Sequence, residues 1–376
     1  MADVFRIEPG VQRYEWGALT GIQELLGMEP DGTPVAEAWW GTHPAAPAHV
    51  EGAPLGDVLQ RDPVAMLGAD VHARWGELPF MLKVLSIAKP LSIQVHPTKE
   101  QARTIREAAT DGPPPLVDAG HKPEMVVAVT PMRVQTGFRP LAQTAADLRR
   151  IGHPLADRLA QLLEGGDLGA YLHAVLDGPP VPDLLERMVE VAAAQGEEAS
   201  ASLTAAAEAS RAHPGDSGAL VSLALNVVEL QPGEACFTDA GVVHSYHSGL
   251  GVEVMATSDN VLRAGLTHKP LHVPLVLEVA RLAAQAPDRP VPHREQAVST
   301  YTAPVDEFEL TFVRDGEHVS PAGPRIVVVV EGEAHLTGAT GALTLSRGQA
   351  AFVAAADAAV TVAGTGLTVI AGVPHP

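Results

Sequence analysis

The sequence has little cysteine and little positive charge. Its single cysteine, Cys236, excludes an intrachain disulfide and is typical of a reducing compartment. The 25 lysines and arginines stand against 45 acidic residues, and this net charge of −20 argues against nucleic acid or an anionic membrane as a partner. No stretch approaches the roughly 20 apolar residues of a membrane span, and residues 1–6 have no signal-peptide pattern. We expect a cytoplasmic protein and a monomer, with an oligomer as the open alternative.

Lysine is rare and unevenly placed. There are five lysines and twenty arginines, and four of the five lysines lie between Lys83 and Lys122. Because lysine and arginine differ as acid–base groups, a chain that mostly uses arginine is expected to keep lysine where a titratable amine is needed. The plainer reading is a chance grouping on a solvated face.

The sequence pattern changes between strand-like and helical along the chain. At 376 residues it exceeds the usual single-core size of roughly 250 to 300, so two or three domains are expected. Apolar runs at 79–85 and 124–129 predict strands separated by turns. Residues 141–212 have a helical pattern broken by Pro and Gly, with helices expected at 141–152, 155–163, 184–194 and in an Ala-rich stretch that ends near 212. Strand-like sequence returns at 221–230, so the helical block is predicted to be an insertion into one β-domain.

Two distant segments share a strand–turn–strand pattern. Residues 230–244, which end on His244, resemble the second cupin motif, with Asp239 where that motif usually has proline. Residues 345–357 echo the pattern without a histidine. This repeat predicts two jelly-roll units, of which only the first keeps the histidine.

These patterns together predict a mainly β fold with two cupin or jelly-roll domains and an α-helical insertion. The metal-binding cupin domain is expected to comprise residues 1–138 and 219–290, with a helix from about 270 to 285. The helical insertion is assigned to residues 139–218 and a degenerate C-terminal jelly roll to residues 296–376.

Four side chains from separate parts of the sequence are predicted to form one metal site. Gln94 and His96 are two positions apart in an apolar run, so in an extended strand both point to the same face. Glu124 and the distant His244 complete the set. Imidazole, carboxylate and amide oxygen suit a borderline divalent metal such as zinc, and one carboxylate among neutral ligands leaves the ion a Lewis acid. The combination indicates an enzyme.

Several phrases of the sequence closely resemble type I mannose-6-phosphate isomerases, in the same order along the chain. They are Tyr14–Gly17, Ala36–Pro44, Leu91–Pro97, His121–Met125, Gly241–Tyr246 and Ser258–Lys269. The resemblance implies a zinc-dependent cupin, with one Zn²⁺ per chain, that interconverts mannose 6-phosphate and fructose 6-phosphate. It carries the family's ligands onto Gln94, His96, Glu124 and His244, its active-site arginine onto Arg263 and its motif lysine onto Lys122.

The expected reaction moves a proton between C2 and C1 through a cis-enediol, which requires a base and stabilisation of negative charge on oxygen. Arg263 and the metal are expected to stabilise this negative charge. Lys122 and Glu253 remain rival candidates for the base, and His121 or Lys122 for help in ring opening.

Substrate binding is assigned to four further residues. Lys99 and Lys269, like Arg263, are candidates for the phosphate, since ammonium and guanidinium groups both suit it, and Ser92 and Tyr246 complete the predicted contacts. The expected partner is therefore a small sugar phosphate.

Some residues near these motifs are interpreted as structural, and two other functions remain possible. His43 is interpreted as structural or solvated, and the tryptophans at 16, 39 and 40 as core or pocket wall. Asp259 and Asn260 are assigned equally to a turn before Arg263 or to a substrate contact. Two other functions stay open: an iron-dependent dioxygenase with two cupin domains, disfavoured by the Gln ligand and the phosphate-type cations, and a non-catalytic sugar-binding cupin, expected to lack an intact ligand set.

Overall fold

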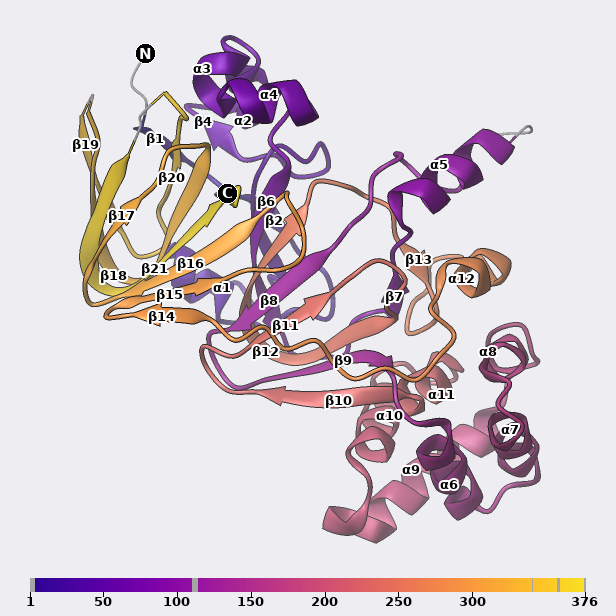
Figure 1. The fold of residues 1–376 in the computed structure, drawn as a ribbon. Helices are drawn as coiled ribbons and strands as arrows, with labels where there is room; N and C mark the ends of the chain where they lie inside the picture. Colours follow the sequence, from indigo (N-terminus) through magenta and orange to yellow (C-terminus); the bar gives the residue numbers. More distant parts are fainter. Residues whose placement is uncertain (1–3, 110–113, 340, 357–358, 375–376) are drawn as a thin grey trace.

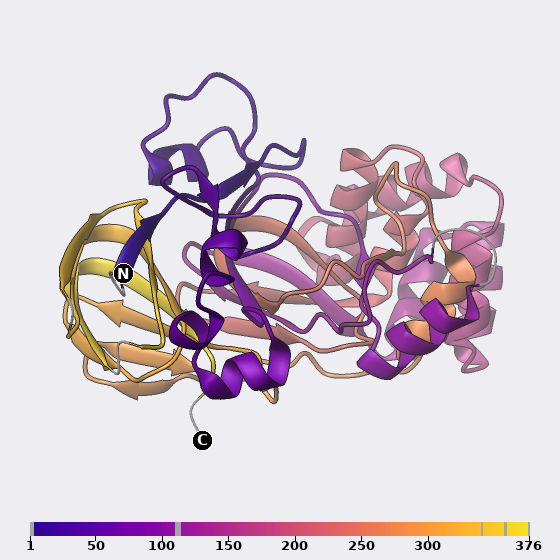
Figure 2. The same cartoon turned by 90° about the horizontal axis from the view of Figure 1, so that it is seen from above.

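The structure, a computed structural model, describes residues 4–109, 114–339, 341–356 and 359–374. Two large antiparallel sheets and one group of helices make up most of it. Figures 1 and 2 show these parts in a row, with the C-terminal sheet at one end, the other sheet in the middle and the helical group at the far end. The mainly β fold with a helical insertion is confirmed.

The central sheet carries the predicted metal ligands. Its strands, in spatial order, are β10 (Leu225–Leu230), β9 (Met132–Phe138), β12 (His244–Ala256), β6 (Phe80–Ile87), β3 (Glu37–Trp40) and β2 (Gly10–Gln12). Attached to this path are β7 (Gln94–Val95), β8 (Glu124–Ala128), β11 (Ala235–Thr238) and β13 (Leu262–Arg263).

Strand β12 pairs with two different groups of strands in this sheet. Its first half pairs with β9 and β7, and its second half with β6 and β8. The register with β9 shifts between Tyr246 and Ser248, as at a β-bulge, and a bulge reverses which alternate residues face inward. His244 and Tyr246 before the shift and Glu253 and Met255 after it therefore line the same cavity.

The C-terminal sheet contains strands from both ends of the chain. Its order is β1 (Val4–Ile7), β20 (Ala350–Val353), β18 (Arg325–Thr337), β21 (Val360–Gly372), β16 (Glu309–Arg314), β15 (Val298–Tyr301) and β14 (His293–Glu295), with β17 (Glu317–Ser320) on β21 and β19 (Ala342–Ser346) on β18. The first strand thus pairs with β20 and lies outside the metal-binding sheet, unlike the boundary drawn at residue 1. Strands β4 (His49–Val50) and β5 (Ala53–Pro54) form a separate pair.

The two segments with a shared pattern adopt the same local conformation. Residues 230–244 run from the end of β10 through β11 to the start of β12, and residues 345–356, the described part of the second segment, run from β19 through β20. Each turn contains a glycine in the left-handed region, Gly233 at φ 82° and Gly348 at φ 79°. A residue with a side chain adopts that conformation only with strain, which explains why glycine recurs in both turns.

The helical group connects the neighbouring strands β9 and β10. Its members are α6 (Leu141–Ile151), α7 (Pro154–Glu164), α8 (Leu168–Leu176), α9 (Pro182–Gln195), a 3₁₀ turn at Gly196–Glu198, α10 (Ala201–Ala212) and α11 (Gly218–Leu223). Four of the helices match the predicted pattern, but α8 was not anticipated. Helix α11 also occupies residues 218–223, where the sequence suggested that a strand begins at 221.

Short helices elsewhere were missed. Residues 1–138, interpreted as strands and turns, also contain α1 (Ile22–Leu26), α2 (Leu55–Leu59), α3 (Pro63–Leu67), α4 (Ala69–Trp75) and α5 (Lys99–Ala108). Four of the five have at most seven residues, too few for a 3.6-residue period to appear. Helix α12 (Val273–Val279) is shorter than predicted, because Ala280 is already extended at ψ 139°.

One hydrophobic core joins the two sheets. Phe80 of β6 and Met125 of β8 belong to the same buried cluster as Phe308, Leu310 and Phe352 of the C-terminal part. The sheets therefore pack directly on one another. No helix in the described part of the chain is both long and apolar enough to cross a membrane.

Candidate active site

A cavity of about 440 Å³ opens beside the central sheet. Four of the five lysines of the chain line it, together with Arg263: Lys83, Lys89, Lys122 and Lys269. In a chain with a net charge of −20, this concentration of cations makes the cavity suited to an anionic ligand. The uneven lysine distribution in the sequence is thus explained by position in the fold.

Three of the predicted metal ligands lie together at this cavity. One ligand atom from each of His96, Glu124 and His244 lies within 4.8 Å of the others, and all three side chains are buried. The Glu124 carboxylate stands between the imidazoles, with Oε1 3.6 Å from Nε2 of His96 and Oε2 3.1 Å from Nε2 of His244. Two imidazoles and a carboxylate at this spacing form a group that fits a metal ion.

Hydrogen bonds on the outer side of both imidazoles fix their orientation. Nδ1 of His96 lies 2.7 Å from the carbonyl oxygen of Asn260, and Nδ1 of His244 lies 3.0 Å from that of Val242. Each Nδ1 must donate to its carbonyl, so in neutral rings both Nε2 atoms direct lone pairs at Glu124. Buried Nε2 of His96 has no hydrogen-bond partner in the described structure. Facing lone pairs and a carboxylate are unfavourable without a cation.

The titration behaviour of the cluster agrees with this arrangement. Burial lowers the pKa of His96 to about 4, which keeps the imidazole neutral and able to ligate. Burial alone would raise the pKa of Glu124, but Lys122 and His96 hold it well below its usual value. His96 and Glu124 therefore present one neutral nitrogen and one carboxylate charge to an ion.

Gln94 lies beside these three residues. Strand β7 places it opposite His244 of β12 and opposite Arg263 of β13, and its side chain lines the cavity. Its amide nitrogen donates to Oγ of Ser92 at 3.1 Å. The amide oxygen remains as the atom that would face a metal, which keeps Gln94 a predicted fourth ligand.

Both candidate bases line the cavity, in different surroundings. Nζ of Lys122 lies 2.9 Å from Oε1 of Glu124. Glu253 is buried, accepts a hydrogen bond from the Tyr246 hydroxyl at 2.9 Å and lies 3.4 Å from Nζ of Lys83. Burial and the charge of Glu124 raise the pKa of Glu253 and outweigh the attraction of the lysines. Such a rise brings a carboxylate closer to the pKa that a general base needs near neutral pH.

The other residues predicted for catalysis and substrate binding divide into those that line the cavity and those that do not. Arg263 and Lys269 line the cavity, as do Ser92 and Tyr246. Lys99 and His121 are not among its lining residues, because both side chains turn to the carboxylate of Glu307. The structure therefore separates Lys99 and His121 from the other predicted contacts.

Other residues of the cavity were not assigned a role from sequence. Lys83 lies on the buried strand β6, with its ammonium 4.7 Å from the centre of the Trp39 ring. Burial by itself lowers the pKa of Lys83, but the carboxylates of Glu37 and Glu253 raise it above its usual value. Trp39 donates to Glu37. The sequence did contain a sign of this role: Lys83 interrupts the apolar run 80–87, and a charged residue is rarely buried without a function or a partner.

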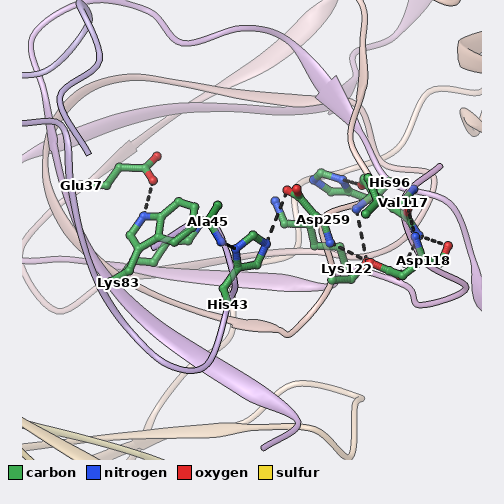
Figure 3. A network of polar contacts seen from close by, with 12 residues as sticks. Glu37, His43, Ala45, Lys83, His96, Val117, Asp118, Lys122 and Asp259 are labelled. Atoms are coloured by element: carbon green, nitrogen blue, oxygen red, sulfur yellow. Dashed lines mark hydrogen bonds and ion pairs between the residues drawn. The ribbon is translucent and has the colours of Figure 1, made fainter. Parts of the chain in front are cut away.

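His43 also lines the cavity, where it is buried and lies outside the three-residue metal cluster. Its Nδ1 accepts from the backbone N–H of Ala45 at 3.2 Å, so Nε2 carries the proton and lies 3.6 Å from Oδ1 of Asp259. Figure 3 shows His43 between the Glu37 and Lys83 side chains and the group around Asp259 and Lys122. Trp16 and Trp39 line the cavity too, whereas Trp40 is fully buried.

Asn260 links the metal cluster to the loop at residues 117–120. Its side chain accepts from the backbone N–H groups of Val117 and Asp118 and donates to the carbonyls of Asp118 and Gly120, while its own carbonyl accepts from His96. Asn260 is therefore structural, and Asp259 is the member of this pair that lines the cavity.

Comparison with known proteins places the chain among one group of enzymes. The profile of the phosphomannose isomerase type I catalytic domain matches residues 4–141. The mannose-6-phosphate isomerase of Escherichia coli is 37% identical over 393 residues, which cover 95% of this chain and 96% of that protein. The human mannose-6-phosphate isomerase is 33% identical over 347 residues, covering 82% of this chain and 81% of that one.

A solved structure agrees over the whole length. The apo form of mannose 6-phosphate isomerase from Salmonella typhimurium superposes with a TM-score of 0.87 at 32% sequence identity, covering 100% of both chains. Sequence and fold thus match the same enzymes from end to end, in keeping with the resemblance of the motifs. The chain belongs to the type I phosphomannose isomerase family.

Proposed function

We propose that this protein interconverts D-mannose 6-phosphate and D-fructose 6-phosphate. The observation that carries the proposal is the His96, Glu124 and His244 cluster in the wall of a cavity that holds four lysines and Arg263. Such a cavity suits a phosphorylated sugar, because the cations attract the phosphate and the cluster can hold a metal near the reacting oxygens. Family membership supports the same reaction.

The metal is proposed to be zinc, held by Gln94, His96, Glu124 and His244. Neutral imidazoles, a carboxylate and an amide oxygen, with no thiolate, form a donor set that zinc accepts. The Nε2 lone pairs directed at Glu124 support the fit of a divalent cation. When bound there, the ion supplies Lewis acidity that stabilises negative charge on substrate oxygen.

The reaction itself is assigned to residues around this cluster. Arg263, whose guanidinium lines the cavity, is proposed to stabilise the negative charge of the enediol. Either Lys122 or Glu253 takes the proton from C2 and returns it at C1. The raised pKa of Glu253 supports the carboxylate. A divalent cation held by Glu124 beside Lys122 would favour the neutral amine, which supports the lysine.

Substrate binding is proposed to use Lys269 and Arg263 for the phosphate, with Ser92 and Tyr246 as polar contacts. Because Lys99 is bonded to Glu307, its predicted contact would require that bond to open. The same holds for His121 and ring opening. His43, whose Nε2–H is directed at Asp259 in the cavity wall, is a better-placed candidate for that step.

The two alternatives predict other behaviour. A dioxygenase would need oxygen for turnover, and a sugar-binding cupin would bind without converting its ligand. The purified protein is therefore assayed with mannose 6-phosphate and with glucose 6-phosphate, with and without oxygen. Oxygen-independent formation of fructose 6-phosphate from the mannose substrate alone supports the proposal, whereas binding without turnover, or turnover only with oxygen, refutes it.

We further propose a cytoplasmic monomer in which the metal-binding sheet, the helical insertion and the C-terminal sheet are separate domains. The single cysteine, Cys236, permits no intrachain disulfide, which supports a reducing location. Light scattering and cell fractionation test these points.

A further inference from the structure

Glu307 stands between two domains. It lies in the connection 302–308, which joins β15 to β16 of the C-terminal sheet, and its side chain is 6% exposed. The next residue, Phe308, is fully buried in the core that both sheets share. This anchor holds the connection against the metal-binding domain.

One oxygen of Glu307 binds two parts of that domain. Oε1 accepts a hydrogen bond from Nζ of Lys99 at 2.7 Å and another from Nε2 of His121 at 2.9 Å. Lys99 follows His96 by three residues at the start of α5, and His121 precedes Glu124 by three residues. The two segments that supply His96 and Glu124 therefore meet at one carboxylate.

The carboxylate is held in its charged form. Burial raises the pKa of Glu307, but the hydrogen bonds from His121 and Lys99 outweigh burial and bring it to about 2. Charge-assisted hydrogen bonds are stronger than neutral ones, so this contact resists separation of the two segments.

We propose that Glu307 is a positioning residue for catalysis, which fixes segment 96–99 against segment 121–124 and so sets the spacing of His96 and Glu124 and the place of Lys122. This rests on the proposed function, since a C-terminal residue then governs the isomerase site. Residues behind metal ligands typically change metal affinity or activity 10- to 100-fold when they are replaced, because small shifts of the ligands weaken coordination.

The test compares three variants of the full-length protein. Glu307→Ala removes both hydrogen bonds, and Glu307→Gln keeps the size and an acceptor oxygen but removes the negative charge that strengthens both bonds. Asp306→Asn is the matched control, because Asp306 lies in the same connection and pairs with Arg74 of α4 on the exposed surface. Zinc affinity is measured by competition with a chromogenic chelator, alongside kcat, KM and Tm.

We expect Glu307→Ala to bind zinc about 10- to 100-fold more weakly and to lose kcat by a similar factor with little change in KM. Glu307→Gln should lie between Glu307→Ala and the wild type, and Asp306→Asn within about twofold of the wild type. A lower Tm with zinc affinity and kcat like those of Asp306→Asn would show that Glu307 is structural only.

If Glu307→Ala does not fold, Glu307→Gln decides the question, because wild-type zinc affinity and kcat in that variant overturn the proposal. A wild-type protein without isomerase activity would refute the proposed function alone. The comparison of zinc affinities would then still test Glu307.

Discussion

Oε2 of Glu124 lies 3.1 Å from Nε2 of His244, although the whole helical insertion separates the two residues in the sequence. Nδ1 of His244 donates to the carbonyl of Val242, so a neutral ring directs a lone pair at the carboxylate. Two acceptors at this distance repel one another unless a cation lies between them.

Replacing His244 with Ala should therefore remove the bound metal. The remaining donors lose the nitrogen that closes the cluster from β12. Metal content is measured by mass spectrometry after dialysis, with exposed His293→Ala as the control. Stoichiometric zinc in His244→Ala would mean that the ligand set is wrong.

Arg263→Ala should lower kcat/KM by about 100-fold or more, which corresponds to about 2.7 kcal/mol of transition-state stabilisation. Arg263→Lys should recover little, because a single ammonium lacks the planar fork of the guanidinium. Steady-state kinetics on both variants decide this. A rise in KM at constant kcat would assign Arg263 to uniform binding of the phosphate.

The proton transfer is visible in deuterated water. A side-chain base that carries the hydrogen from C2 to C1 exchanges some of it with solvent, so we expect deuterium at C1 of fructose 6-phosphate, in a small fraction if the cavity stays dry. NMR measures the incorporation. Absence of deuterium at every pH would favour a hydride shift.

The same experiment separates Lys122 from Glu253. Replacement of the base by Ala should abolish both turnover and exchange at C2, whereas a variant with slow turnover and retained exchange lacks a helper in ring opening. If neither Lys122→Ala nor Glu253→Ala slows proton loss from C2, both assignments fail.

Glu307 also gives stability a defined pH dependence. Its pKa is about 2 when folded and near 4.5 when unfolded, so its ionised form stabilises the fold above pH 4.5 and this contribution falls as pH drops toward 2. The difference in unfolding free energy between wild type and Glu307→Gln should shrink as the pH falls from about 4.5 toward 2. A difference that grows on acidification would contradict this assignment.

The local motifs of the site were readable from the sequence. Gln94 and His96 share a short apolar run, and Glu124 begins a predicted strand, so their residue types and spacing pointed to a metal before any contact was known. Helices such as Leu141–Ile151 are long enough for a helical repeat of apolar residues to show in the sequence, and were equally predictable. What these features share is that each depends on neighbours in the sequence.

The contacts between distant segments were not readable. Glu307 meets Lys99 and His121 only because the C-terminal sheet packs on the metal-binding sheet, and no local pattern marks that meeting. Asn260 looked like a turn residue because its bonds to His96 and Asp118 span more than 140 positions. The sequence fixes residue types, whereas tertiary packing decides which of them face the cavity.

The central claim is that a metal held at His96, Glu124 and His244 is required to isomerise mannose 6-phosphate. The most direct measurement follows fructose 6-phosphate formation by the purified protein before chelation, after removal of the metal, and after zinc is returned. We expect activity to disappear with the metal and to return in proportion to bound zinc, up to one ion per chain. Full activity in protein shown to be free of metal would contradict the account.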